Sequence, residues 1–315
     1  MKKNFFLILI SLTSLTISAQ KNSSRAVYLD SLYRETLEEN HKYKRVIEDY
    51  FLNKDSYKVI ELYKSGAKKM VGTTLNKDII KKDGTFVYFY ENGTKEAIIT
   101  YSDGWKTGKE YKWYDNGNSK FEKENIYDPK AKTLKTLLIR FWNKENQLTV
   151  IDGNGECDDN DEDFQEKGKI KDGLKQDVWY GKDLKNKVRY TETYNKGNLV
   201  SGISTDKDSL KYSYSKIFEK PTPEVGMDNF YKNISVYYKT PDEAFKNKVQ
   251  GQIYVTFVVD VMGKITKPII IKDLGYGTGE EAVKALYSAG NWIPGKIRGI
   301  KRSTLFSIPI TIRGK

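Results

Sequence analysis

Cysteine and histidine are almost missing from this chain of 315 residues, which holds one of each. The single cysteine, Cys157, excludes a framework of intrachain disulfides. Its acidic neighbours Glu156, Asp158 and Asp159 are expected to raise the pKa of its thiol. We therefore expect a spare thiol at this position and not a nucleophile.

The single histidine, His41, is expected at the surface. The sequence offers no serine–histidine–aspartate set and no spacing typical of metal ligands. We therefore expect no catalytic residues, no metal, no cofactor and no enzymatic activity. Carboxylates that only folding brings together stay open as an alternative, because the chain holds 42 acidic residues.

Long apolar runs are missing too, except at the start. Two lysines precede an apolar stretch from Phe5 to Ile17, and Ala19 offers a small residue for cleavage. This pattern is typical of a secretory signal peptide over residues 1–19. An uncleaved anchor is the alternative, although the stretch is shorter than the roughly twenty residues that span a bilayer. We expect an exported protein, periplasmic or envelope-associated, without a lipidated cysteine or a transmembrane helix in the mature chain.

Acidic charge is in the minority, because 54 Lys and Arg face 42 Asp and Glu and give a net charge of +12. Nucleic acid is not an expected partner of an exported chain, whereas anionic headgroups, acidic polymers or acidic peptides are compatible with the charge. Most of the lysines are expected to serve solubility alone. Aromatic residues are abundant at 13%, and tyrosine alone occurs 23 times. This composition favours half-buried β-strands over a helical bundle.

Two segments repeat at a distance of 24 residues, "GTFVYFYENG" at 84–93 and "GKEYKWYDNG" at 108–117. Their aromatic residues alternate, which predicts strands with one aromatic face. Asn92-Gly93 and Asn116-Gly117 predict tight hairpin turns with two positive-φ positions each. Weaker copies flank these two, so we expect stacked hairpins that form one antiparallel sheet over residues 57–218.

These segments resemble MORN-type repeats in the tyrosine or tryptophan pair that is followed by Asn-Gly. The resemblance implies a surface for contact with a protein, a membrane or another envelope component, and no common chemistry. The aromatic face would be core of the repeat in one interpretation and a platform for sugar rings in the other. Its residues are Tyr88, Tyr90, Trp113 and Tyr114.

Two further segments of this region are ambiguous. Residues 20–56 form a lead-in segment, and residues 25–52 fit a helix or two edge strands equally well. The stretch from Asp152 to Asp163 is read as a solvated acidic loop. A calcium loop is the minority hypothesis, since Cys157 and Asp163 stand where glycine and glutamate are required.

A second domain, 226–315, follows a linker at 219–225 that contains Pro221 and Pro223. Its pattern predicts helix, strand, strand, helix and strand, hence a three-stranded antiparallel sheet with two helices. The expected fold class is α+β, a mostly antiparallel repeat sheet followed by this smaller sheet. "GYGTG" at 275–279 imitates a phosphate loop, but it follows an antiparallel hairpin and is read as a helix entry.

The stretch from Gly226 to Ile312 resembles the TonB C-terminal domain. The resemblance depends on "VQGQIYVTFVVDVMGKI", on "GTGEEAVKAL" and on Trp292, Pro294, Gly295 and Lys296. It implies a protein-binding module that adds an extended segment of an outer-membrane receptor beside its last strand. An envelope scaffold or glycan-binding protein without a role in energy transduction is the alternative. The residues expected to contact the partner are Thr304, Leu305, Phe306, Ser307, Ile308 and Ile310.

Overall fold

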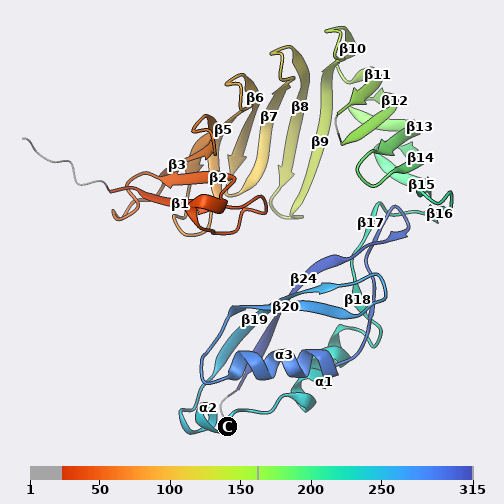
Figure 1. The fold of residues 1–315 in the computed structure, drawn as a ribbon. Helices are drawn as coiled ribbons and strands as arrows, with labels where there is room; N and C mark the ends of the chain where they lie inside the picture. Colours follow the sequence, from red (N-terminus) through yellow and green to blue (C-terminus); the bar gives the residue numbers. More distant parts are fainter. Residues whose placement is uncertain (1–22, 162, 314–315) are drawn as a thin grey trace, which may run out of the picture. The chain divides into compact units, whose positions relative to one another are not determined.

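A computed structural model describes residues 23–161 and 163–313 (Figure 1). The expected signal peptide at 1–19 lies outside the described residues. Contacts divide the chain into two compact units, one with residues up to Asn118 and Asn125–Lys135, the other with Ser119–Glu124 and Thr136–Lys315. The boundary falls within two strands, β8 (Ser119–Asp128) and β9 (Thr133–Trp142).

Sixteen strands form one antiparallel sheet, and their order in the sheet follows the sequence (Figure 1). Each strand therefore pairs with the strands before and after it, as expected for consecutive hairpins. The strands are β1 (Arg25–Leu29), β2 (Tyr43–Ile47), β3 (Tyr57–Tyr63), β4 (Lys68–Thr74), β5 (Lys82–Phe89), β6 (Lys95–Ser102), β7 (Trp105–Trp113), β8 (Ser119–Asp128), β9 (Thr133–Trp142), β10 (Leu148–Ile151), β11 (Asn154–Asn160), β12 (Phe164–Lys171), β13 (Leu174–Asp183), β14 (Val188–Asn195), β15 (Asn198–Thr205) and β16 (Lys211–Tyr214).

The remaining elements follow the sheet. They are β17 (Phe218–Glu219), β18 (Thr222–Pro223), α1 (Met227–Tyr237), α2 (Asp242–Lys246), β19 (Gly251–Val259), β20 (Ile265–Lys272), α3 (Thr278–Ser288), β21 (Trp292–Ile293), β22 (Lys296–Ile297), β23 (Ile300–Lys301) and β24 (Thr304–Ile312). Three small sheets result, with the orders β17-β22-β23, β18-β21 and β20-β19-β24.

The expected fold class was wrong. The chain is mostly β, with 53% strand and 10% helix, and one long sheet of sixteen strands dominates it. The error has a physical origin in the lead-in, where short strands were not separable from a helix. Residues 25–52 form β1, one turn of 3-10 helix at Glu38–Asn40, and β2. The C-terminal part also differs, because the described residues hold three small sheets and three α-helices there in place of one sheet with two helices.

The expected acidic loop at 152–163 was also wrong in its central part. Asn154–Asn160 is strand β11, which pairs with β12 over six residue pairs. Cys157 points to the buried face of this strand, while Glu156 is exposed. The acidic composition thus concealed a period-two pattern. No group of three or more His, Cys, Asp or Glu side chains that could hold a metal occurs among the described residues.

The repeat turns carry one positive-φ residue where two were expected. Gly93 has φ 88° and Gly117 has φ 87°, but neither preceding asparagine has a positive φ. The Gly93 amide donates to the Tyr90 carbonyl at 2.9 Å, as in a type I turn followed by a glycine bulge. Asn92 instead accepts from the Thr94 amide at 2.9 Å. Asn-Gly is compatible both with this turn and with the expected two-residue turn that has two positive-φ positions. The sequence alone therefore did not distinguish the two turn types.

Glycines inside the strands make room for aromatic rings of the neighbouring strand. Gly168 pairs with Trp179 and Gly181 with Tyr190, and Gly202 pairs with Tyr214. A Cβ added to any of these three glycines would lie within 2.1–2.5 Å of the partner ring. The rings therefore lie flat over the glycine backbone on one face of the sheet. This pairing offsets the weak strand propensity of glycine.

The C-terminal elements enclose a hydrophobic core of their own. Phe230 and Ile234 of α1 and Leu286 of α3 pack against β19, whose buried residues alternate from Ile253 to Val259. Figure 1 shows α1 and α3 next to each other along the sheet β20-β19-β24. No helix in the described part of the chain is long and apolar enough to span a bilayer.

Candidate functional site

β24 is the last strand in the order β20-β19-β24. It pairs with β19 through nine consecutive residue pairs, from Thr304 opposite Val259 to Ile312 opposite Gly251, without a register shift. An edge strand presents backbone N–H and C=O groups on the side that has no neighbouring strand. β24 therefore offers a straight ladder of backbone groups along one margin of the sheet.

Alternate side chains of β24 fix the strand to the core. Ile308, Ile310 and Ile312 are 1%, 3% and 6% exposed and belong to the hydrophobic cluster under the helices. Phe306 is partly buried and lies with its ring centroid 5.0 Å from that of Trp292. The intervening side chains point away from the core, and Leu305 is 67% exposed. The core-facing side chains thus hold the backbone of β24 in place. This order before binding lowers the conformational entropy that is lost when a partner strand is added.

The turn between β19 and β20 closely approaches β21, whose Trp292 contacts Phe306 of β24. Gly263, in the turn between β19 and β20, has φ 80°, and its carbonyl accepts from the Trp292 amide at 2.9 Å. A Cβ on Gly263 would lie 1.8 Å from the Trp292 carbonyl oxygen, so only glycine fits. Trp292 is 1% exposed and contacts Phe230 and Phe257 with ring centroids 5.1 and 5.4 Å away.

The glycine-rich stretch before α3 is occupied by a side chain of the protein itself. The Asp273 carboxylate accepts from the Leu274 amide at 2.8 Å and from the Thr278 hydroxyl at 2.9 Å. Burial opposes its ionisation, but these bonds and backbone bonds from Gly275 and Gly279 hold its pKa below the ordinary value. A carboxylate already fills the position that a phosphate would take, in agreement with a helix entry.

The predicted aromatic face lies within the first unit, and its members hold neighbouring hairpins together. The Tyr90 hydroxyl donates to the Trp113 carbonyl at 2.8 Å, and Tyr63, one repeat earlier, donates likewise to the Phe89 carbonyl at 2.9 Å. Tyr114 is only 7% exposed. The Tyr88 hydroxyl accepts from the Lys82 ammonium at 2.7 Å. These hydrogen bonds join the aromatic residues to other residues of the repeat sheet.

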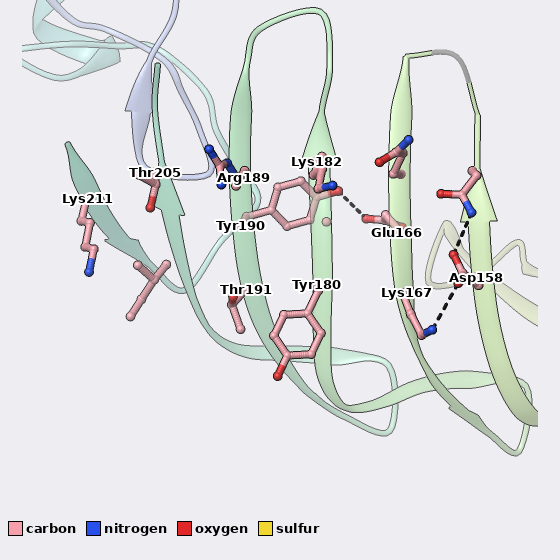
Figure 2. Close-up of a pocket in the computed structure, with 14 residues that line it drawn as sticks. Asp158, Glu166, Lys167, Tyr180, Lys182, Arg189, Tyr190, Thr191, Thr205 and Lys211 are labelled. Atoms are coloured by element: carbon pink, nitrogen blue, oxygen red, sulfur yellow. Dashed lines mark hydrogen bonds and ion pairs between the residues drawn. The ribbon is translucent and has the colours of Figure 1, made fainter. Parts of the chain in front are cut away.

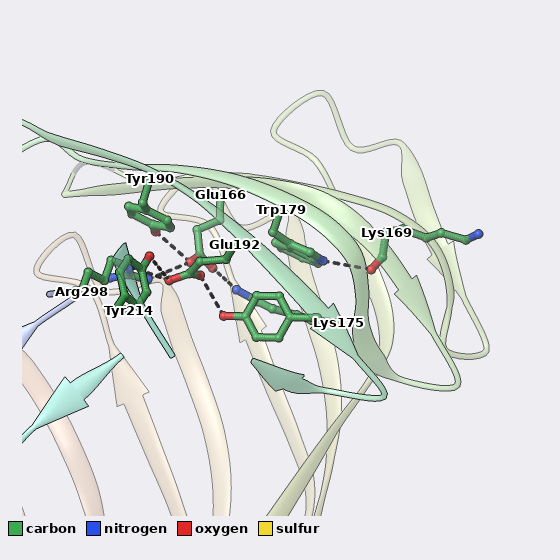
Figure 3. A network of polar contacts seen from close by, with 9 residues as sticks. Glu166, Lys169, Lys175, Trp179, Tyr190, Glu192, Tyr214 and Arg298 are labelled. Carbon is green, nitrogen blue, oxygen red and sulfur yellow. Dashed lines mark hydrogen bonds and ion pairs between the residues drawn. The ribbon is translucent and has the colours of Figure 1, made fainter. Parts of the chain in front are cut away.

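A hairpin of the C-terminal part is anchored to the long sheet by one arginine (Figure 3). Arg298 lies at the tip between β22 and β23, where it and Gly299 have φ values of 51° and 78°. Its Nε donates to Glu192 at 2.9 Å, and its guanidinium carbon lies 3.6 Å from the centre of the Tyr190 ring. The Ser204 hydroxyl donates to the Arg298 carbonyl at 2.7 Å.

Arg298 donates hydrogen bonds to two glutamates, Glu192 and Glu166, on the face of the sheet that carries Tyr190. Glu192 is fully buried and accepts from the hydroxyls of Tyr194 and Tyr214 at 2.8 and 2.7 Å. Glu166 accepts from Lys175 at 2.7 Å and from the Tyr190 hydroxyl at 2.8 Å. We refer to Arg298, Glu192, Glu166, Lys175, Tyr190, Tyr194 and Tyr214 as the arginine anchor.

Sequence reasoning missed the arginine anchor, although one signal for it existed. In "YTETY" the alternation that buries Tyr190 and Tyr194 also places Glu192 on the buried face. A buried carboxylate requires a cation or several donors, because an isolated buried charge is very costly. The cation comes from 106 residues further along the chain, a distance that no local pattern reveals.

No protein-family model matches this chain, and no curated protein matches it. Among solved structures, the NMR solution structure of the TonB C-terminal domain of Helicobacter pylori is similar to it. The similarity covers 27% of this chain and 89% of that chain, with 19% sequence identity and a TM-score of 0.22. The likeness to known proteins is thus a partial structural one to a TonB C-terminal domain, and the resemblance to MORN-type repeats stays a prediction.

Proposed function

We propose that this protein is an exported binding module of the cell envelope, which captures an extended segment of another protein as an additional strand beside β24. The observation that carries the proposal is the unbroken nine-pair register of β24 at the end of its sheet. Main-chain hydrogen bonds supply affinity in this mode of recognition, and pockets or contacts for alternate side chains supply specificity.

The other edge of the same sheet is less suited to strand addition. β20 pairs with β19 through a ladder with two register shifts. It also contains Pro268, which lacks a donor, and Lys267 with a positive φ of 50°. Prolines and bulges are the devices by which proteins protect sheet edges from pairing. β24 also contains one proline, Pro309, but it has no register shift and no residue with a positive φ, so its edge is the preferred acceptor.

Specificity would come from the outward side chains of β24. Leu305, Ser307 and Pro309 alternate on the face that points away from the core. Pro309 lacks a backbone N–H, so the partner segment would form one main-chain hydrogen bond fewer at this residue. The expected partner is a periplasmic segment of an outer-membrane receptor, by the resemblance of this region to the TonB C-terminal domain. The chain would act by binding and not by catalysis.

Site-specific photocrosslinking tests this proposal. A photoreactive amino acid replaces Ser307 in β24 or, as the matched control, Ile271 in β20, since both side chains are exposed. The full chain is expressed in its own envelope and irradiated, and crosslinked peptides are identified by mass spectrometry. We expect one extended segment of an outer-membrane receptor at position 307 and none at 271. Equal products at both positions would contradict strand addition at β24.

A further inference from the structure

The face of the long sheet opposite to the arginine anchor carries a trough that crosses β11 to β16 (Figure 2). Its volume is about 670 Å³, within the range of ligand-binding sites. Neighbouring strands lie about 4.8 Å apart, so the five spacings between these six strands span ~24 Å. The trough is therefore long enough for an extended chain and runs perpendicular to the strands.

One wall of the trough is a continuous cross-strand row. Each member is the direct register partner of the next, so their side chains share a face. Three members are cations and three are neutral hydrogen-bonding groups, and the row holds no carboxylate. In order from β16 to β11 the row is Lys211, Thr205, Arg189, Lys182, Gln165 and Asn160.

The cations of this wall are available to a ligand. Lys182, Arg189 and Lys211 are exposed, and none of them forms an ion pair with another described residue. Arg189 and Lys182 face each other directly across β14 and β13. Two like charges opposite each other destabilise a sheet. An anion between them would remove this repulsion, which makes the wall a site for negative charge.

The other wall is less charged and contains a flat apolar surface. It consists of Ile203, Thr191, Tyr180, Lys167 and Asp158, again direct register partners in that order. Tyr180 is 61% exposed and Ile203 is 51% exposed. Lys167 is paired with Asp158 at 3.2 Å. In Figure 2, Tyr180 and Thr191 lie on one side of Tyr190, and Arg189 and Lys182 lie on the other.

The floor between the two walls is backbone. Tyr190, Gly181 and Glu166 form the row between them. The Tyr190 ring and the Glu166 carboxylate belong to the arginine anchor on the opposite face, and Gly181 has no side chain. Side chains of this row therefore do not fill the trough. The anchor fixes the floor, because its contacts join β12, β14 and the hairpin of Arg298.

We propose that this trough binds an acidic polysaccharide, a glycan chain that carries carboxylate or phosphate groups. The cationic wall would pair with the anionic groups, and the hydroxyl and amide groups would bond to sugar hydroxyls. The exposed ring of Tyr180 would pack against the apolar face of a sugar ring. This site is separate from β24 and neither requires nor excludes strand addition there.

Two other polyanions fit the trough less well. A nucleic-acid duplex carries one negative charge about every 1.7 Å. Four cations over ~24 Å, one of them neutralised by Asp158, match a polymer of much lower charge density. A bilayer presents a broad plane of headgroups, and a plane cannot reach the floor between two walls. A single glycan strand can do so.

Calorimetric titration of the full chain with defined oligosaccharides tests the proposal. Hexagalacturonate is the carboxylated probe, its methyl ester is the neutral match, and pentamannose 6-phosphate is the phosphorylated probe. We expect at least one acidic probe to bind about tenfold more tightly than the neutral one, and more weakly as salt is added. The acidic probe that binds identifies carboxylate or phosphate as the recognised group. Absence of binding by both acidic probes would overturn the proposal.

Variants locate the binding. Lys182→Gln with Arg189→Gln should weaken binding about tenfold. The charge-matched control, Lys171→Gln with Lys216→Gln, removes two exposed lysines outside the trough and should bind like the native chain. Tyr180→Ala should weaken binding, and Tyr180→Phe should retain it. An equal loss of affinity in the control would show non-specific electrostatic attraction and would refute binding in the trough.

One measurement needs no variant. Hexagalacturonate or pentamannose 6-phosphate, whichever binds, should protect Lys182 and Lys211 of the native chain from acetylation and leave Lys171 reactive. Uniform reactivity of the three lysines in the presence of the bound probe would contradict the assignment. So would stronger binding to phosphatidylglycerol vesicles or to a DNA oligonucleotide than to the acidic glycans.

Discussion

At the scale of single residues, Glu192 shows how the long sheet and the C-terminal hairpin depend on each other. It is fully buried, and its oxygens accept from two tyrosines and from Arg298. A buried pair of charges contributes little net stability compared with apolar packing, but removing one partner leaves the other uncompensated. The arginine anchor is therefore sensitive to any substitution that removes its cation.

Arg298→Ala should lower the free energy of unfolding by roughly 3 to 5 kcal/mol, because Glu192 then loses its charged partner within the sheet. Urea unfolding followed by tryptophan fluorescence measures this change. Arg189→Ala is the matched control, since it removes an exposed arginine from the opposite face of β14, the strand that carries Glu192. It should change stability by less than about 0.5 kcal/mol. Similar losses in both variants would contradict the role of the anchor.

Glu166 makes the same anchor sensitive to acid. Burial favours its neutral form, but Lys175, the Tyr190 hydroxyl and Arg298 outweigh burial and hold its pKa below the ordinary value of 4.5. A carboxyl group whose folded pKa is lowered stabilises the protein above its unfolded pKa. This contribution is lost as the pH falls through the folded pKa.

Glu166→Gln should therefore cost roughly 1.5 to 3 kcal/mol at about pH 7, and this difference from the native chain should shrink below about pH 4.5. Unfolding free energies of both proteins, measured between about pH 7 and about pH 3, show the difference at neutral pH and its decrease in acid. Glu145→Gln, in an exposed turn, serves as the control and should follow the native curve. A difference that stays constant with pH would contradict the ionised state of Glu166.

At the scale of elements, the turn between β19 and β20 is fixed by its contact with β21. Gly263 and Gly275 have nearly equal φ values of 80° and 81°, but only Gly263 faces another backbone, the Trp292 carbonyl. Gly275 has open space around the position of a Cβ. The two glycines thus separate the cost of the conformation from the cost of the close approach.

Gly275→Ala should destabilise the chain by about 1 kcal/mol, the cost of a left-handed conformation for alanine. Gly263→Ala should cost roughly 3 kcal/mol or more, because the turn must move away from Trp292. Thermal unfolding monitored by circular dichroism compares the two variants. Equal losses would show that the contact with Trp292 contributes nothing.

Element positions were predictable where one pattern dominated. The alternation from Ile253 to Val259 predicted β19, and the stripe from Ala282 to Ala289 predicted α3. The pairing of glycines such as Gly181 with rings such as Tyr190 was not predictable, because the pattern shows an interrupted strand and not its partner. The acidic residues around Cys157 concealed β11 for a different reason, because their composition is also typical of a solvated loop.

The candidate sites were predictable to different degrees. β24 followed from the sequence as the last strand. The division of its residues between two faces did not, because Ile308 and Ile310 were expected to contact a partner and their side chains are buried in the core. The trough and the arginine anchor did not follow either, since each unites residues of several strands through register. Lys211 and Asn160, for example, share a wall only because five successive strand pairings align them.

At the scale of the whole molecule, the two candidate binding sites lie in the second compact unit. The trough crosses β11 to β16, and β24 begins six residues after Arg298. The excess of positive charge, +12 over the chain, favours acidic partners at any exposed surface. Main-chain pairing at β24 does not depend on this charge, so the two modes of binding differ in their response to salt.

Residue-resolved amide hydrogen exchange of β24 tests strand addition most directly, with the segment captured at position 307 added as a synthetic peptide. In the free protein, alternate amides of β24 face away from β19 and should exchange quickly. The peptide should slow these alternate amides and leave β20 unchanged. Protection that appears instead on α1 or α3, or that leaves the outward amides of β24 fast, would contradict strand addition.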